Sequence, residues 1–284
     1  MEYELKDLQA AVLYIAKEIK RICDANNIKY TMIGGTLIGS LRHQGFIPWD
    51  DDIDFVMARN EYNRFLVCCK KQLSDEFELM DWHEDAYWPN GMAKILLKGT
   101  VAIPNNRENA KYKRMIFVDI IPFDKIPDSK FLQLKQRAII SFCRKFIFLH
   151  SDDTIYNRFT GGKRILHKLL MIPTKYMNRN RLVEICEKEL SRYSSDNTKN
   201  YTSIIGSYGY NKEIVPVSIF ENYIELPFED TTFMAIKEYD LYLKQVFGNY
   251  MEMPPVEKRI NHGMLKLDFG DFFDRHKDVR NSIK

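Results

Sequence analysis

One short stretch of the chain, WDDDIDFVM (Trp49–Met57), carries four aspartates at the entrance to an apolar run. Mutual repulsion makes such a cluster costly in a folded core unless a positive charge lies among the carboxylates. Three interpretations are open at this point: a solvated turn, a nearby lysine, or a bound metal ion. The four acids are Asp50, Asp51, Asp52 and Asp54.

The last two acids of this cluster have strand spacing. If DIDFVM is a strand, Asp52 and Asp54 project from one face about 6.5–7 Å apart along the backbone, where they can converge on a divalent cation. The alternative is a solvated edge strand or a helix N-cap. The interleaved Ile53, Phe55 and Met57 favour a strand with one buried face. Alternation would turn Asp51 away, toward solvent.

A third acid lies in another apolar run, RMIFVDIIPFD (Arg114–Asp124). Asp119 in such a strand is unfavourable unless it is paired or ligates a metal. Placed beside Asp52 and Asp54, it would complete a three-carboxylate cluster suited to two ions of Mg²⁺ or Mn²⁺ and to phosphoryl or nucleotidyl transfer. Asp119 is then the best-placed acid to meet the attacking hydroxyl and is a candidate base.

A strand–glycine–helix unit precedes the acids. IKYTMI (28–33) reads as a strand, Gly34 and Gly35 break it, and TLIGSLRH (36–43) reads as a short helix. Glycines allow close approach of a ligand, and the helix N-terminus attracts phosphate. A tight turn without ligand is the alternative. The expected phosphate contacts are Gly34, Gly35, Thr36 and Ser40.

Flanking elements predict an α+β fold. A small mixed sheet flanked by helices fills residues 1–128, and a mostly helical region, 129–284, packs on it and completes the substrate site. The elements expected are helices at 5–25 and 59–73, a hairpin formed by FELMDW and GMAKILLKGT, a basic helical stretch at about 130–194 with a joint at Gly161–Gly162, and a helix that begins at Thr231 and is ended by Gly248.

Bulk properties exclude several classes of protein. The 284 residues include 42 basic and 39 acidic side chains, a balance that does not suggest a nucleic-acid partner. Five cysteines without metal-type spacing indicate a reducing compartment. The polar N-terminus is unlike a signal peptide, and no apolar run is long enough to span a bilayer. We expect a cytoplasmic protein.

These segments resemble a known family. The helix, strand, glycine pair and acidic strand are similar to the nucleotidyltransferase superfamily related to DNA polymerase β. GGTLIGSLRHQGFIPWDDDIDFVMAR is similar to the signature of the LicD family of bacterial phosphocholine transferases, distant relatives of fukutin and fukutin-related protein. FVDIIPFD, YGY and GNYMEMPPVEKRINH look like further family blocks. The 16 residues between Gly35 and Asp52 exceed the superfamily's usual spacing but are LicD-like, and no cysteine cluster suggests that family's zinc insertion.

The resemblance implies a phosphotransferase for substituted phosphate groups. Such an enzyme moves a phospho-alcohol, usually from CDP-choline, to a sugar hydroxyl of teichoic acid, lipopolysaccharide or another surface glycan, and releases CMP. Acceptors on lipid carriers imply peripheral contact with the inner membrane face, for which the Lys and Arg residues of 130–188 are suited. For any single one of them, a solvated helix surface is the simpler interpretation.

Two basic residues are candidates for phosphate binding. Arg42 lies one turn beyond the glycines and has the geometry to clamp a diphosphate, the alternative being a surface salt bridge. Lys94, alone in the apolar GMAKILL, is equally consistent with a phosphate ligand and with a structural role.

Other residues are candidates for shaping the substrate site. Trp49 and Asp50 are expected to support the acidic loop. A choline group would sit in an aromatic cage, for which Trp88 and Tyr208 are candidates among several core aromatics. Arg259 and His262 match family positions, although such residues are more often structural.

Two other functions compete with this one. A nucleotidyltransferase that moves NMP onto a small molecule or protein would use the same metal site but release pyrophosphate. A degenerate fold acting as a binding or scaffold module is disfavoured because the three acids, both glycines and Arg42 are intact.

Overall fold

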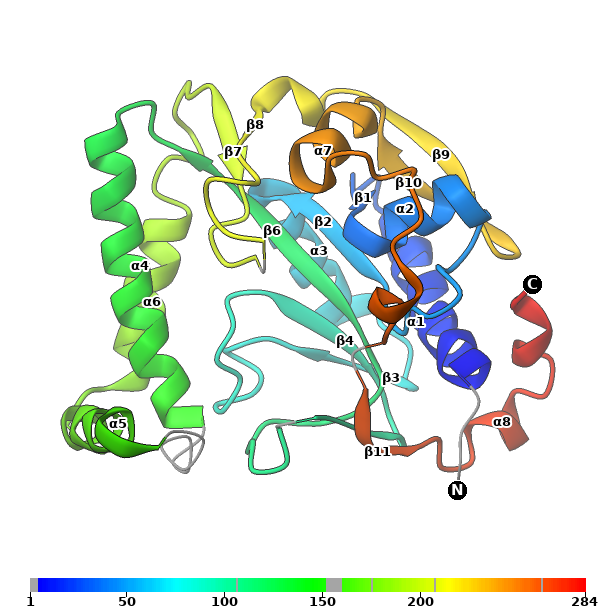
Figure 1. Ribbon diagram of the computed structural model, residues 1–284, viewed down its shortest axis with the longest axis horizontal. Coiled ribbons are helices and arrows are strands. Elements are labelled where there is room, and N and C mark those ends of the chain that lie inside the picture. Colours follow the sequence, from blue (N-terminus) through cyan, green and yellow to red (C-terminus); the bar gives the residue numbers. More distant parts are fainter. Residues whose placement is uncertain (1–4, 106, 152–159, 175, 207, 262) are drawn as a thin grey trace.

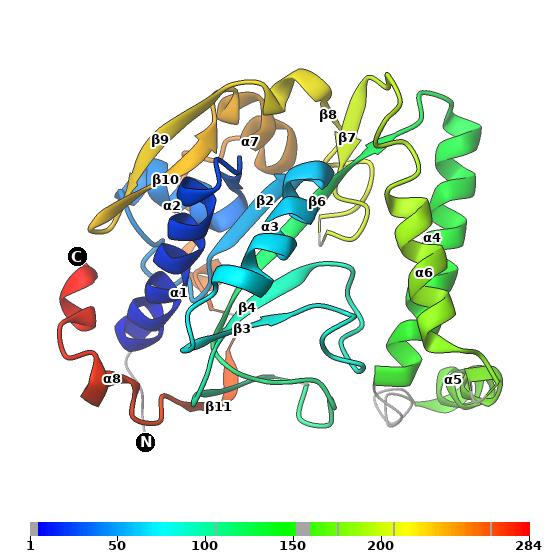
Figure 2. The same cartoon turned by 180° about the vertical axis from the view of Figure 1, so that it is seen from behind.

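The computed structural model describes residues 5–105, 107–151, 160–174, 176–206, 208–261 and 263–284. Helix α1 (Leu5–Ala25) has the bounds expected from its sequence. Its apolar residues recur every three to four positions and are buried, while Asp7 lies in the first turn, where the helix dipole favours an acid. Burial of this stripe against the sheet fixes the helix on the face seen in Figure 2.

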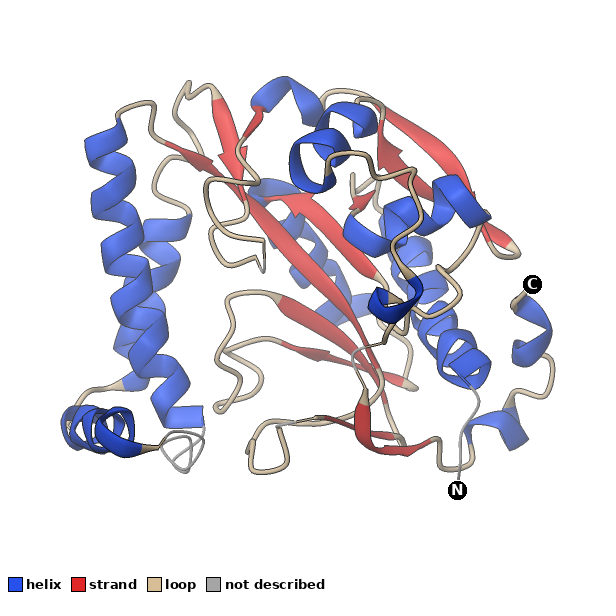
Figure 3. Cartoon of the chain, viewed as in Figure 1, coloured by secondary structure: helices blue, strands red, loops and turns tan. Residues whose placement is uncertain are grey.

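A mixed sheet forms the centre of the molecule (Figures 1 and 3). Its main strand order is β1-β2-β6-β4-β3, with β7 pairing to β6 and β8 to β7. Only β2 and β6 of the main order run parallel. These strands are β1 (Thr31–Met32), β2 (Asp54–Ala58), β3 (Phe77–Met80), β4 (Ala93–Leu97), β6 (Phe117–Ile126), β7 (Asn200–Thr202) and β8 (Val215–Pro216).

Helices lie around this sheet. α1 and α3 cover one face, α2 and α7 lie on the other side, and α4, α5 and α6 form a separate group at one edge (Figures 1 and 2). The remaining α-helices of the described chain are α2 (Gly34–His43), α3 (Arg59–Gln72), α4 (Lys130–Ser151), α5 (Gly161–Thr174), α6 (Arg179–Leu190), α7 (Tyr239–Phe247) and α8 (Phe272–Arg275). The expected helix end at Gly248 is confirmed, with φ of 67° at the cap, but the expectation that this helix begins at Thr231 is wrong, because Thr231–Ile236 form a strand.

The second half of the chain is less helical than expected. The helical prediction is confirmed for α4 to α6, and Gly161 begins α5 with φ of 57°. Beyond Leu190 the prediction of a mostly helical region is wrong, because strands pair there with one another and with the first half. Besides β7 and β8, they are β9 (Tyr223–Phe228), β10 (Thr231–Ile236) and β11 (Met264–Asp268), which pairs with β5 (Val101–Pro104).

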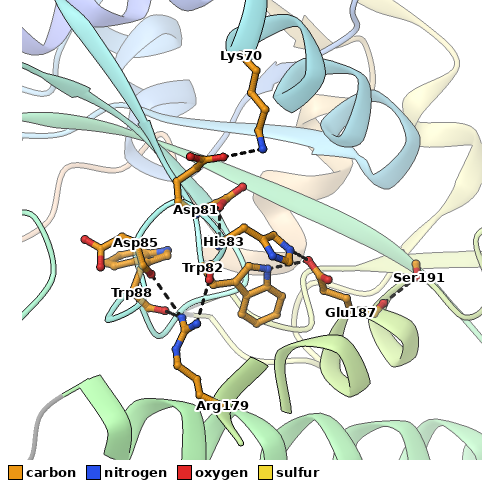
Figure 4. Close-up of polar contacts among 10 residues, drawn as sticks. Lys70, Asp81, Trp82, His83, Asp85, Trp88, Arg179, Glu187 and Ser191 are labelled. Carbon is orange, nitrogen blue, oxygen red and sulfur yellow. Dashed lines mark hydrogen bonds and ion pairs between the residues drawn. The ribbon is translucent and has the colours of Figure 1, made fainter. Parts of the chain in front are cut away.

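A long loop between β3 and β4 is fastened to α6 (Figure 4). Arg179 donates to the backbone oxygens of Trp82, Asp85 and Trp88, at 3.1, 3.5 and 2.9 Å. Glu187 accepts from Trp82 Nε1 at 2.8 Å and lies 2.7 Å from His83 Nε2. The helical group is therefore fixed to the sheet through the expected hairpin of β3 and β4.

A buried ion pair fixes the parallel strands against α3. Arg59 Nε and Nη2 donate to the two oxygens of Asp124 at 2.6 and 2.9 Å. Asp124 has no exposed surface, and burial raises its pKa while the Arg59 guanidinium opposes that rise. The bidentate geometry satisfies both carboxylate oxygens, which is the condition under which a buried pair is tolerated.

Removing one half of this pair should be costly. We expect Asp124→Asn to lower the free energy of unfolding by roughly 3–5 kcal/mol, because the Arg59 charge then stays buried without its counter-ion. Urea unfolding measures the change. Asp230→Asn is the matched control, since Asp230 pairs with Lys17 at a similar distance of 2.7 Å but on the surface; it should change stability by under about 1 kcal/mol. Equal effects from the two substitutions would contradict the assignment.

Candidate active site

Strand register brings the acids of two separate apolar segments together. In the parallel pair β2–β6, Asp54 lies directly beside Asp119, and in the antiparallel pair β4–β6, Lys94 lies directly beside Asp119. The expectation that the two acidic strands are neighbours is confirmed. Three ionisable side chains therefore stand in a row across three adjacent strands.

The lysine in this row pairs with one of the acids. Lys94 Nζ lies 2.5 Å from Asp119 Oδ1, and both side chains are largely buried. The ammonium also lies 3.2 Å from the ring centroid of Phe117 and 5.3 Å from that of Trp88. A nearby lysine was one of the three interpretations of the acidic stretch, and the structure has such a lysine paired with the neighbouring Asp119. A phosphate-binding role for Lys94 stays a prediction.

A cavity of about 670 Å³ opens beside these strands. It is lined by acids from the β1–β2 region and from β6, by glycine and apolar side chains, and by polar residues from the second half of the chain. The chemically informative lining residues are Gly35, Asp50, Asp51, Asp52, Asp54, Arg107, Asp119, Arg144, Ser203, Tyr208 and Glu213. Its size and its mixture of apolar walls with convergent polar groups are those of a small-molecule site.

Asp54 has a strongly perturbed environment. Its pKa is raised well above the ordinary value, first by burial, then by the charges of Asp52 and Asp119, with Lys94 opposing the rise. A carboxylate in this position stabilises added positive charge. The geometry therefore fits a cation-binding role for these acids, although among the described residues no three acidic, histidine or cysteine side chains are already gathered around one point.

The local structure of the acidic loop differs from the expectation in one respect. Strand β2 begins at Asp54, so strand alternation does not extend back through Asp52 and Asp51. Asp51 is 3% exposed and lines the cavity, so the prediction that it is solvated is wrong. Asp52 lines the same cavity although it precedes the strand.

Helix α2 begins at the glycine pair rather than at Thr36. Gly34 has φ of 55°, which disfavours other residues there, and a Cβ at Gly35 would overlap the carboxylate of Asp50. No described side chain caps this helix start. The Asp54 amide donates to Thr36 Oγ1 at 2.9 Å, so α2 positions the first residue of β2. Ser40 lies elsewhere, with its hydroxyl donating to Pro227 O at 2.8 Å.

Arg42 and Arg259 belong to a neighbouring region that does not line this cavity. Arg42 Nη1 donates to the backbone oxygens of Tyr250 and Glu252 at 3.3 and 3.1 Å. The guanidinium of Arg259 lies 5.3 Å from the ring centroid of Trp49. Burial and the charge of Arg259 lower the pKa of Arg42, so the two cations are neighbours. Their substrate roles, and the support given by Trp49, stay predictions.

Of the two aromatic candidates, Tyr208 lines the cavity and Trp88 does not. The Tyr208 hydroxyl lies 3.1 Å from where a Cβ of Gly34 would be. Trp88, in the β3–β4 loop drawn in Figure 4, is 2% exposed, and its Nε1 donates to Met92 O at 2.8 Å. His262 lies outside the described residues.

The sequence did not predict several polar lining residues, among them Arg107, Arg144, Ser203 and Glu213. Arg107, beyond β5, and Arg144, on α4, bring positive charge to the cavity, while Ser203 and Glu213 flank the β7–β8 connection. Arg144 was visible only as one cation in a basic helix. Nothing in the local sequence distinguishes Ser203 or Glu213 from surface residues, because tertiary packing alone brings them to the wall.

The chain is similar in sequence to known proteins. The family model for the LicD/FKTN/FKRP nucleotidyltransferase domain matches residues 27–152. The chain is 30% identical over 269 residues to the lipopolysaccharide cholinephosphotransferase LicD of Haemophilus influenzae, covering 91% of this chain and 95% of that protein. The chain belongs to the LicD family. It is also 32% identical over 135 residues to an uncharacterized protein of Rickettsia prowazekii, covering 46% of each.

The LicD family match contains the acids, the glycine pair, Lys94 and both cavity arginines, since all of them fall within residues 27–152. The resemblance inferred from the sequence is therefore confirmed. Among the described residues of this LicD family chain, no helix is long and apolar enough to cross a membrane.

The Lys94–Asp119 pair provides a test of how the acids are kept together. We expect Lys94→Met to lower the free energy of unfolding by roughly 3 kcal/mol in EDTA, because Asp119 then stands beside Asp54 without compensation. Lys98→Met is the control: Lys98 is exposed and its Nζ donates to Asp75 O at 2.8 Å. Unchanged stability of the Lys94 variant in chemical unfolding would mean that other groups neutralise the cluster.

Proposed function

We propose that this LicD family chain is a metal-dependent phosphotransferase. It moves a phospho-alcohol, most often phosphocholine, from a CDP-linked donor to a sugar hydroxyl of a lipopolysaccharide, teichoic acid or capsule precursor and releases CMP. The observation that carries the proposal is that Asp52, Asp54 and Asp119 line one cavity beside the glycine turn. The cholinephosphotransferase activity of the H. influenzae relative supports it.

A cation fits the acidic wall of the cavity. Asp52, Asp54 and Asp119 offer hard oxygen donors, and burial among like charges raises the pKa of Asp54, which added positive charge would relieve. Mg²⁺ or Mn²⁺, as two ions, would neutralise charge on the donor diphosphate and on the attacking oxygen. Asp119 is placed beside Asp54 and Lys94, so Lys94 is positioned to hold this carboxylate in place.

The remaining lining residues suit the rest of a CDP-alcohol. Arg107 and Arg144 are cations at the same cavity and suit phosphate oxygens. Gly35, at an uncapped helix start, suits the same group. Tyr208 provides an aromatic surface for a quaternary ammonium or a base. The proposed phosphate-binding residues also include Gly34, Thr36, Ser40, Arg42 and Lys94. The proposed substrate-shaping residues also include Trp49, Asp50, Trp88, Arg259 and His262.

The catalytic unit proposed is a nucleotidyltransferase-type core of residues 1–128, related in fold to DNA polymerase β. Residues 129–284 would complete its substrate site. The cavity supports this division of labour, because its aspartates come from the first region, and Arg144, Ser203 and Glu213 come from the second.

Transfer of NMP with release of pyrophosphate is the competing reaction. The same three acids would serve it, and the difference lies in which half of the nucleotide is transferred. The similarity to the cholinephosphotransferase relative covers 91% of this chain and favours the first reaction.

Replacement of one acid tests the proposed reaction. We expect Asp54→Asn to abolish turnover of CDP-choline with Mg²⁺ while leaving the thermal stability equal or raised, because the repulsion among the carboxylates is relieved. CMP and pyrophosphate are separated by chromatography; CMP supports the proposal and pyrophosphate supports the competing reaction. The control is Asp75→Asn, an exposed acid outside the cavity. Full activity of the Asp54 variant would eliminate the metal hypothesis.

A cytoplasmic enzyme with a lipid-carried acceptor needs a contact with the inner membrane face, and α5 is suited to it. The described apolar side chains of this helix are exposed, Ile165, Leu166, Leu169 and Ile172 by 62, 54, 57 and 55%. Lys163, Arg164 and Lys168 lie on the same helix, whose sequence contains no acid. Such a helix complements an anionic lipid surface, whereas the like charges of a second copy would repel it.

Vesicle binding tests this contact. We expect the protein to sediment with vesicles of one-quarter phosphatidylglycerol but not with pure phosphatidylcholine, and Leu166→Ser with Leu169→Ser to weaken binding by roughly tenfold or more. Val67→Ser is the control, because Val67 is 55% exposed on α3. Equal sedimentation of the α5 variant, or binding independent of anionic lipid, would rule the contact out.

A further inference from the structure

Two buried polar side chains of the cavity have no part in the reaction proposed above. Ser203 follows β7 and Glu213 precedes β8, so the connection between these short strands brings both to the cavity wall. Their exposed fractions are 1 and 2%. Polar groups this deeply buried normally have hydrogen-bond partners.

Each of the two side chains has an unused hydrogen-bonding atom. Glu213 Oε1 accepts from the hydroxyl of Tyr242, on α7, at 3.2 Å. Glu213 Oε2 and Ser203 Oγ are buried and make no hydrogen bond with any residue that the structure describes. An unsatisfied buried acceptor is costly, and for a carboxylate the cost is larger than for a neutral group. A ligand that supplies the missing bonds would recover this cost.

The two unused oxygens lie close to each other, on either side of Gly206. A Cβ placed on Gly206 would lie 2.6 Å from Ser203 Oγ and 2.7 Å from Glu213 Oε2. Both oxygens therefore flank the same backbone position, and the absence of a side chain at Gly206 leaves room between them. Tyr208 follows two residues later and lines the same cavity.

The chemistry of these atoms selects one kind of ligand group. A carboxylate oxygen accepts hydrogen bonds, and a serine hydroxyl both donates and accepts. A quaternary ammonium offers no hydrogen bond to either, and a phosphate is repelled by the carboxylate. Two neighbouring hydroxyls satisfy both atoms, as when an acidic side chain binds the ribose of a nucleotide.

We propose that Ser203 and Glu213 form a subsite that binds the neighbouring hydroxyls of a sugar ring. The subsite rests on the proposed function, which supplies two such rings: the ribose of the cytidine nucleotide and the sugar of the acceptor. It is separate from the carboxylates proposed to hold metal and adds a determinant of sugar specificity to the cavity.

Calorimetry with CMP and 2′,3′-dideoxy-CMP tests whether the subsite binds the hydroxyls of the ribose. If ribose is the ligand, the wild type prefers CMP by about 10- to 100-fold, as expected for hydroxyl bonds to a buried carboxylate. Glu213→Gln, Ser203→Ala and Gly206→Ala should then bring the preference close to unity without changing the affinity for the dideoxy nucleotide. Saturation-transfer NMR with galactose, glucose and ribitol, at saturating CMP, tests in the same variants whether the subsite binds the acceptor sugar.

This test has two controls: the stability of Glu213→Gln and a substitution of an exposed acid outside the subsite. Glu213→Gln keeps an oxygen for Tyr242 and removes a buried carboxylate whose pKa burial raises to about 7, so the variant should fold at least as stably as the wild type. Glu221→Gln, an exposed acid following the same connection, should leave both preferences unchanged.

The outcomes separate the subsite from the proposed function. Loss of either the ribose preference or sugar binding in the Ser203 and Glu213 variants supports the subsite. CMP binding with no hydroxyl preference and no sugar contact overturns the subsite but leaves the proposed function standing. Binding of choline chloride that is lost in Glu213→Gln overturns it in favour of a cation site. Absence of any cytidine nucleotide binding overturns the proposed function and the subsite together.

Discussion

The carboxylates of Asp54 and Asp119 are held side by side on neighbouring parallel strands, and the surrounding structure depends on keeping them there. Burial first, and then the charges of Asp52 and Asp119, raises the pKa of Asp54, and repulsion between ionised carboxylates would push the strands apart if nothing opposed it. Lys94, one strand further along, lies 2.5 Å from Asp119 and opposes it. Behind the same strands, the buried Arg59–Asp124 pair fixes β6 to α3.

This constraint explains why distant segments meet at one cavity. Parallel register alone sets Asp54 against Asp119, and the hydrogen bond from the Asp54 amide to Thr36 sets the distance between β2 and the glycine turn. The cavity is then closed by residues that arrive more than 80 positions later along the chain, such as Ser203 and Glu213. The aspartates come from β2, from the loop that precedes it and from β6, whereas much of the remaining polar wall comes from helix α4 and the β7–β8 connection.

The sequence predicted the parts whose signal is local. Periodicity located α1 to the residue, and acids inside apolar runs identified Asp54 and Asp119 as unusual. The pairing of Lys94 with Asp119 was not predictable, because it depends on the order of strands in the sheet. Asp51 was misjudged because β2 starts later than its apolar pattern suggests. Beyond Leu190, β7 pairs with β6 and β11 with β5 over long sequence distances, so no local pattern reveals these partners.

The cavity combines an acidic wall with two arginines, and this combination constrains how a diphosphate enters it. The diphosphate of a CDP-alcohol, which carries two negative charges, is attracted by Arg107 and Arg144 and repelled by any ionised aspartates beside it. Under the proposed chemistry, a divalent cation among the acids would oppose this repulsion and so would assist nucleotide binding as well as the transfer. Nucleotide and cation would then bind cooperatively, each lowering the electrostatic cost of the other.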